Sequence, residues 1–207
     1  MNVQGRRVVP PKLRTGDLVF FQGTGVVSNA IKIVQFSRWS HVGIVIIDPA
    51  FNVPLIYEAT HTCIIRDLDT GTKLPGVKLV TFQDSLNKYP GKMAIRRLSG
   101  VSDRDLNLTA GDDLRNTLRG RMFEKSFLQL MRADTFFLPK NRKEDLSSIF
   151  CSELVVAYMQ AIGLLCTSRL SNNFGPAHLV SRRLRLLKGR YGKLEYIKAS
   201  SKRSPIS

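Results

Sequence analysis

Three residues in this sequence have side chains that could together perform nucleophilic chemistry: a cysteine, a histidine and a carboxylate. Cys151 lies in the segment 147–155 (SSIFCSELV), which we expect in the first turn of the chain's most apolar helix. Free backbone N–H groups and the helix dipole stabilise a thiolate at such a position. A thiolate attacks carbonyl carbon, so Cys151 is a candidate nucleophile. Alternatively, Cys151 is a small buried hydrophobic residue, the common fate of a lone cysteine.

A thiolate needs a base, and the chain has only three histidines, His41, His61 and His178. His41 begins the run 41–47 (HVGIVII), which is typical of a strand, so its side chain can project from the end of a sheet. Gly43 in the same run suggests the close approach of another backbone or of a substrate. The alternative is that His41 only terminates the strand.

Glu58 is a carboxylate inside the otherwise apolar run 53–59 (VPLIYEA), which we expect to pair with the His41 strand across a turn at 49–52. A buried charge is costly unless it has a partner. Glu58 could therefore orient the imidazole and fix its tautomer. A structural salt bridge to one of the many arginines is an equal alternative.

The remaining patterns describe the elements that must position these residues. The predicted strands are residues 17–21, 41–47, 53–59, 77–82, 92–98 and 193–198, with 62–66 as a continuation of the sheet. The predicted helices are residues 26–36, a short basic helix at 177–187, and one broken or two short helices in 103–131, interrupted near Gly111 or Gly120. A further helix is capped by Ser147 or Ser148, runs through Ile162 and stops at Gly163.

This order predicts an α+β fold, with an antiparallel sheet packed against the helix that carries Cys151. We expect a flexible basic arm at 1–12, one domain at 13–198 and a basic flexible tail at 199–207. The stretch 101–146 is long and basic and has no motif to which we can assign a role.

The composition limits the compartment and the partners. The hydrophobic fraction of 43% is that of a globular protein, whereas the net charge of +16 predicts an anionic partner: nucleic acid, phospholipid headgroups or an acidic partner surface. The cationic residues concentrate at both ends of the chain: Arg6, Arg7, Lys12 and Arg14, and then Arg182, Arg183, Arg185, Lys188, Arg190, Lys193, Lys198, Lys202 and Arg203.

Cys63, Cys151 and Cys166 form an odd set without CxxC spacing, which favours a reducing compartment over a disulfide framework. The scattered histidines predict no metal site, and no phosphate-binding loop predicts a cofactor. The sequence shows no signal peptide and no apolar run long enough for a membrane span. We therefore expect a cytoplasmic or virion-packaged protein.

Four short motifs in one order resemble the NlpC-type papain-like superfamily. They are Gly16–Phe21 (GDLVFF), Ser40–Val45 (SHVGIV), Tyr57–Ala59 (YEA) and Phe150–Val155 (FCSELV). In the standard members the cysteine helix comes before the strands, whereas here it follows them. The chain is therefore most similar to the circularly permuted branch, which includes relatives of lecithin retinol acyltransferase, bacterial YiiX-like proteins and a poxvirus virion-associated group.

The resemblance covers roughly residues 13–187 and implies a papain-like fold with Cys151 as nucleophile, His41 as base and Glu58 as the orienting residue. It implies a cysteine-dependent hydrolase or acyltransferase acting on amide, ester or thioester bonds, with a lipid or an acyl-amide as substrate. One alternative is a cysteine peptidase. Another is a non-enzymatic basic virion or structural protein that binds nucleic acid or an anionic membrane through its charge.

Overall fold

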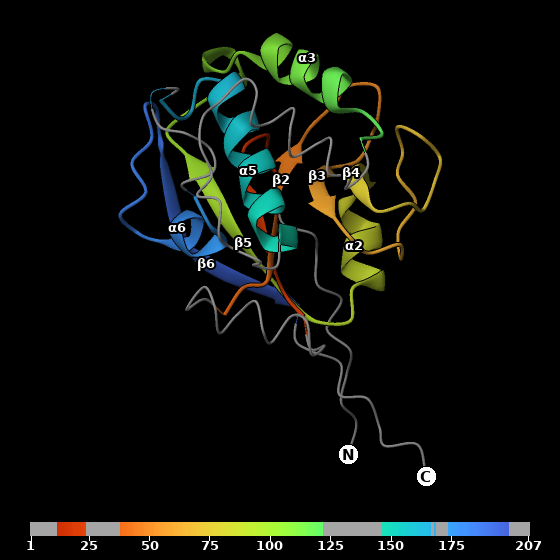
Figure 1. Cartoon of the computed structure of the whole chain (residues 1–207). Helices are drawn as coiled ribbons and strands as arrows, with labels where there is room; N and C mark the ends of the chain where they lie inside the picture. The colour runs from red at the N-terminus through yellow and green to blue at the C-terminus, as the bar shows by residue number, and fades with distance from the viewer. Residues whose placement is uncertain (1–11, 24–37, 122–145, 167, 169–173, 199–207) are drawn as a thin grey trace, which may run out of the picture.

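The computed structural model describes residues 12–23, 38–121, 146–166, 168 and 174–198, without the side chains of 146–150. In this part of the chain, a six-stranded antiparallel sheet is accompanied by a few helices, in a mixed α/β arrangement (Figure 1). The strands are β1 (Leu18–Gln22), β2 (His41–Ile46), β3 (Leu55–Thr60), β4 (Gly76–Thr81), β5 (Lys92–Ser99) and β6 (Arg190–Lys198). The helices are α2 (Phe82–Lys88), α3 (Leu108–Leu118), α5 (Leu146–Ala161), α6 (Pro176–Val180) and the short 3₁₀ helix η1 (Asp103–Asp105).

The strands lie in the order β4-β3-β2-β1-β5-β6, and each neighbouring pair is antiparallel. The strands β2 and β3 form the predicted hairpin, with Ile44 opposite Tyr57. The six main strand predictions are confirmed, with ends that differ by one to three residues. The predicted helix at 26–36 and both chain ends lie outside the described residues.

The sheet separates two apolar clusters because successive strand residues point to opposite faces. One face carries Leu18, Ile44, Tyr57 and Leu79, and it packs against α5. The other face carries Val19, Phe21, Val45, Ile56, Val80 and Ile95, and it packs against Phe82 at the beginning of α2. Strands β1 and β2 are buried on both faces, so they provide a rigid platform for side chains at their ends.

Helix α5 packs across β2 and β3 with its apolar residues, including Leu154, Val155 and Met159. It ends as predicted, before Gly163, whose φ of 77° is a left-handed conformation that favours glycine. It begins at Leu146, which corrects the prediction that Ser147 or Ser148 caps it. None of the helices in the described part of the chain is long and apolar enough to cross a membrane.

Helix α3 lies against α5 at Gly111, where an added Cβ would come within 2.8 Å of Ile162 Cγ2 and 2.9 Å of Tyr158 Oη. Gly111 is therefore not the interruption, because this glycine permits close helix packing inside α3. The helix break predicted near Gly111 or Gly120 falls at the second position, after Leu118 and before Gly120, whose φ is 65°.

Two further predictions are wrong, and a buried cation explains each. Residues 62–66 form a loop rather than a strand, because the carbonyls of Thr62 and Ile65 accept hydrogen bonds from the Lys78 ammonium at 2.9 and 3.3 Å. The helix predicted at 177–187 ends at Val180, because the Arg96 guanidinium binds the carbonyls of Leu179 and Ser181 at 2.6 and 2.9 Å.

Candidate active site

The first residue of β2 and a carboxylate of β3 form an ion pair at one end of the sheet. His41 Nε2 lies 2.8 Å from Glu58 Oε2, with side chains only 16% and 8% exposed. The structure thus places the predicted pair together. Among the described residues, Glu58 has no ion pair with an arginine, so the alternative of a structural Arg–Glu bridge does not hold there.

Gly43 gives the Glu58 side chain the space to reach His41. The β2–β3 register puts Gly43 opposite Glu58, and an added Cβ at Gly43 would come within 3.4 Å of Glu58 Cβ and 2.5 Å of Ile56 Cγ2. A side chain at this position would collide with the residues next to the pair. The close approach that the sequence analysis predicted at Gly43 is therefore confirmed, and it is made by β3.

Cys151 is the second hydrogen-bond partner of the His41 ring. Burial alone would lower the pKa of His41, but the Cys151 sulfur and the Glu58 carboxylate outweigh burial and raise this pKa to about 10. Nε2 is the ring nitrogen that faces Glu58. A pKa raised this far favours the protonated imidazole at neutral pH.

Cys151 is fully buried, whereas Cys63 and Cys166 are exposed. Burial alone would also suit a cysteine of the core, but a core cysteine needs no imidazole partner. Cys151 is the sixth residue of α5, so the prediction that it lies in the first turn is wrong. The helix dipole acts mainly within that first turn, so it contributes little at the sulfur.

Aromatic side chains pack against the imidazole on the side of the neighbouring strand β1. The Phe21 ring lies 5.1 Å from the His41 ring and 4.9 Å from the Tyr89 ring, measured between ring centroids. The hydroxyl of Ser40 donates to the Phe21 carbonyl at 3.3 Å, which fixes the residue before His41. These contacts restrict the orientation of the ring.

Lys78 is a residue of this site that the sequence analysis missed. It is 3% exposed and lies directly opposite Glu58 in the β3–β4 register. Burial lowers the pKa of the Lys78 ammonium, against the attraction of nearby groups that include Glu58. The signal was present in the sequence, because Lys78 is a charge in an apolar strand, as Glu58 is.

The other two histidines do not join the site. His61 is exposed in the loop after β3, and His178 is exposed in α6. In the part of the chain that the structure describes, no three histidine, cysteine or acidic side chains are grouped as a metal site.

Comparison with known proteins gives distant similarity to solved structures alone. No protein-family model matches the sequence, and no curated protein matches it. Among solved structures, the fold is similar to that of the metalloprotein YiiX from Escherichia coli O157:H7, with a TM-score of 0.48 and 20% sequence identity. The match covers 72% of this chain and 66% of that chain, so this chain spans slightly less than two thirds of the neighbour's length.

Proposed function

We propose that this chain is a cysteine-dependent hydrolase or acyltransferase that acts on amide, ester or thioester bonds. We place it in the circularly permuted papain-like class, near the YiiX-like and poxvirus groups that its motifs resemble. The observation that carries the proposal is the His41 imidazole, which is hydrogen-bonded at the same time to Cys151 and to Glu58. A cysteine nucleophile, a base and an orienting carboxylate have this mutual arrangement.

The reaction would begin with attack of the Cys151 thiolate on an acyl carbonyl carbon, which moves the carbonyl electron pair onto oxygen. When the tetrahedral intermediate collapses, the His41 imidazolium donates its proton to the leaving nitrogen, oxygen or sulfur. The product is a thioester on Cys151. Water or an acceptor then attacks this thioester, with His41 taking its proton, and the thiolate is released. Glu58 keeps the imidazole oriented throughout.

The resemblance favours a lipid or a small acyl-amide as substrate, since the permuted relatives include lipid acyltransferases. A peptide substrate would use the same three residues, because the chemistry at the carbonyl is the same. Hydrolysis and acyl transfer differ only in the acceptor of the second step.

Alkylation by iodoacetamide tests the proposal without a known substrate. We expect Cys151 of the native protein to react at pH 6 at least about tenfold faster than the exposed Cys63 and Cys166, because only a thiolate is nucleophilic. His41→Ala should remove this preference, since the charge beside the sulfur is lost. Mass spectrometry of the three cysteine-containing peptides measures all the rates in one sample, so Cys63 and Cys166 serve as internal controls.

A result in which Cys151 reacts no faster than Cys63, with no change in His41→Ala, contradicts the proposal. Circular dichroism of His41→Ala must match the wild type, so that a loss of reactivity cannot come from unfolding. The wild type is then tested against acyl esters, thioesters and peptides to identify the bond that is cleaved. Cys151→Ser serves as the inactive control.

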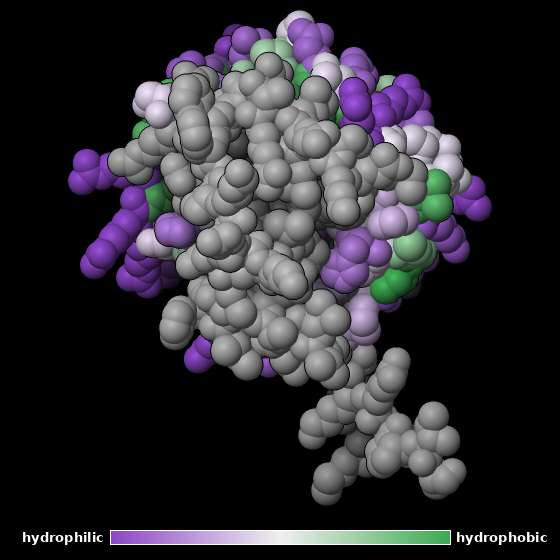
Figure 2. All heavy atoms as spheres, in the orientation of Figure 1, coloured by the Kyte–Doolittle hydropathy of each residue, from purple (hydrophilic) through white to green (hydrophobic). Residues whose placement is uncertain are grey.

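The surface charge favours a second function, the binding of anionic polymers or membranes. Exposed cations that include Arg182, Arg185, Lys188 and Arg190 lie between α6 and β6. Hydrophilic side chains also project around the described part of the surface (Figure 2). Such binding should be unspecific in sequence and should weaken steeply with salt. It should persist in Cys151→Ser, which separates it from the acyl chemistry.

A further inference from the structure

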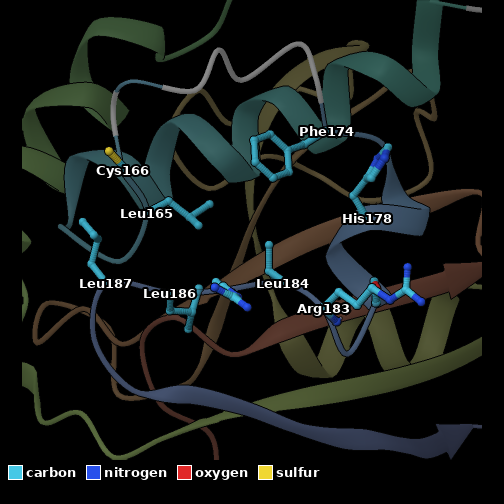
Figure 3. A pocket seen from close by; sticks show the side chains of 10 residues that line it. Leu165, Cys166, Phe174, His178, Arg183, Leu184, Leu186 and Leu187 are labelled. Carbon is cyan, nitrogen blue, oxygen red and sulfur yellow. Dashed lines mark hydrogen bonds between the residues drawn. The ribbon is translucent and has the colours of Figure 1, made fainter.

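A pocket of about 510 Å³ lies beside α5, where α6 and the segment 181–187 face the helix (Figure 3). This volume lies within the range of roughly 300–1,000 Å³ that is typical of small-molecule sites. The pocket includes Leu165 and Cys166 after α5, but none of the three residues of the candidate active site lines it. Its ligand therefore does not depend on the chemistry at Cys151.

The segment 181–187 forms one wall of the pocket, and hydrogen bonds fix it at both ends. At one end, the Arg96 guanidinium donates to the carbonyls of Leu179 and Ser181. At the other end, the Leu187 N–H donates to the Leu164 carbonyl at 2.9 Å. Arg96 is itself only 3% exposed. The pocket is therefore formed before any ligand binds, which reduces the entropy cost of binding.

The lining of the pocket combines apolar side chains with three basic residues, Arg183, Arg185 and His178. Leu165, Phe174 and Leu184 point toward one another across the space, and His178 and Arg183 lie on the same side of it (Figure 3). The His178 Nδ1 accepts a hydrogen bond from the Gly175 N–H at 3.0 Å, so in the neutral ring the proton lies on Nε2.

Both polar groups on this side can thus donate to an anion. Arg183 presents a guanidinium, which matches the geometry of a carboxylate or a phosphate. No acidic residue is among those that line the pocket. The pocket therefore combines an anion site with an adjoining apolar surface.

We infer that this pocket binds a fatty acid, with the carboxylate at Arg183 and His178 and the alkyl chain along Leu165, Leu184 and Leu187. A fatty acid has the required polarity, since one end is a planar anion and the remainder is an unbranched apolar chain. Burial of each methylene stabilises the complex, so a long chain contributes most of the affinity.

Fluorescence titration of the full chain with cis-parinaric acid tests this inference. We expect saturable binding that laurate displaces. Lauryl alcohol lacks the anion and butyrate lacks the chain, so each should displace the probe at least about tenfold less well than laurate.

Variants locate the site. Arg183→Glu reverses the charge at the anion end, and Leu187→Asp places a carboxylate at a leucine that is 62% exposed. Each should weaken probe binding about tenfold or more. Arg104→Glu and Leu74→Asp make the same changes at exposed positions outside the pocket and should bind as the wild type does. Circular dichroism of all four variants establishes that they are folded.

The inference is overturned if the wild type shows no saturable binding, if lauryl alcohol competes as well as laurate, or if the control variants lose affinity equally. A self-association that sedimentation detects and that excludes the probe would also overturn it, since a second copy would then occupy the pocket.

Discussion

Two regions of this protein differ in how far their charged side chains are exposed to water. At the end of β2 and β3, His41, Glu58 and Lys78 lie nearly out of contact with water, and each has a polar partner inside the protein. Around α6 and β6, the cations Arg183 and Lys188 are exposed. A charge in the first region acts on its neighbour at low dielectric, whereas a charge in the second is screened by water and salt.

This difference separates a region suited to chemistry from one suited to binding. Buried charges change the protonation of a neighbouring group, which a nucleophile and its base require. Exposed cations attract anions from solution at little cost in stability. Arg96 is the exception in the second region, because it is buried and holds the backbone that shapes the pocket.

We expect the largest effect from Arg96→Met, which tests whether the two regions are independent. The change removes hydrogen bonds to the carbonyls of Leu179, Ser181 and Gly192 and leaves buried acceptors without their cation. We expect the free energy of unfolding in urea to fall by about 3 kcal/mol. Binding of the fatty-acid probe should be lost, while alkylation of Cys151 is retained. Arg97→Met, at the exposed neighbour, is the control and should change stability by less than about 1 kcal/mol.

A loss of Cys151 alkylation in Arg96→Met, equal to the loss of probe binding, would show that the two regions form one cooperative unit rather than two.

An intermediate effect is expected from the ionisation of His41. Its pKa is raised from 6.5 to about 10 in the folded protein, so its contribution to stability is complete below pH 6.5 and is lost as pH rises through about 10. The stability difference between wild type and His41→Gln should therefore shrink by about 2 kcal/mol between pH 6 and pH 8, since each pH unit above 6.5 removes about 1.4 kcal/mol. Urea unfolding at each pH measures it.

The same substitution at the exposed His61 serves as the control for His41→Gln. A stability difference for His41→Gln that does not change with pH would mean that His41 is not protonated in the fold.

The smallest effect is expected from Gly43→Ala. The added methyl group meets Ile56 Cγ2 at 2.5 Å and lies 3.4 Å from Glu58 Cβ. We expect a loss of about 1 kcal/mol of stability, and a severalfold slower alkylation of Cys151 as Glu58 is displaced from His41. Gly192→Ala is the control for space, because an added Cβ there meets only the Arg97 carbonyl oxygen at 3.7 Å, an ordinary contact distance. Alkylation of Cys151 in Gly43→Ala at the wild-type rate would show that the position of Glu58 does not govern the sulfur.

The strands and the pairing of His41 with Glu58 could be predicted because local signals were strong. The run from His41 to Ile46 is apolar, and a carboxylate inside an apolar strand needs a partner. The same reasoning applied to Lys78 and Arg96 would have identified both buried cations. The catalytic roles of the three site residues, the papain-like class and the proposed domain limits stay predictions.

The misplaced elements have a common physical cause. Residues 62–66 and 181–187 have strand-like and helix-like patterns, yet their carbonyls bind Lys78 and Arg96, which lie far away in the sequence. Local propensity does not include the effect of a partner that only the tertiary structure brings near. The sequence could not decide between Gly111 and Gly120 as the helix break for a similar reason, because the partner that accounts for Gly111 is Ile162 in the loop after α5.

The order of the elements has a consequence for how the protein matures during synthesis. The hairpin of β2 and β3 leaves the ribosome early and can bring His41 and Glu58 together by local pairing. The sulfur arrives much later, with α5, after β5 has already been made. The nascent chain thus holds an imidazole and a carboxylate without a nucleophile. The reactivity that we propose for Cys151 would therefore appear only when the cysteine helix docks on the sheet.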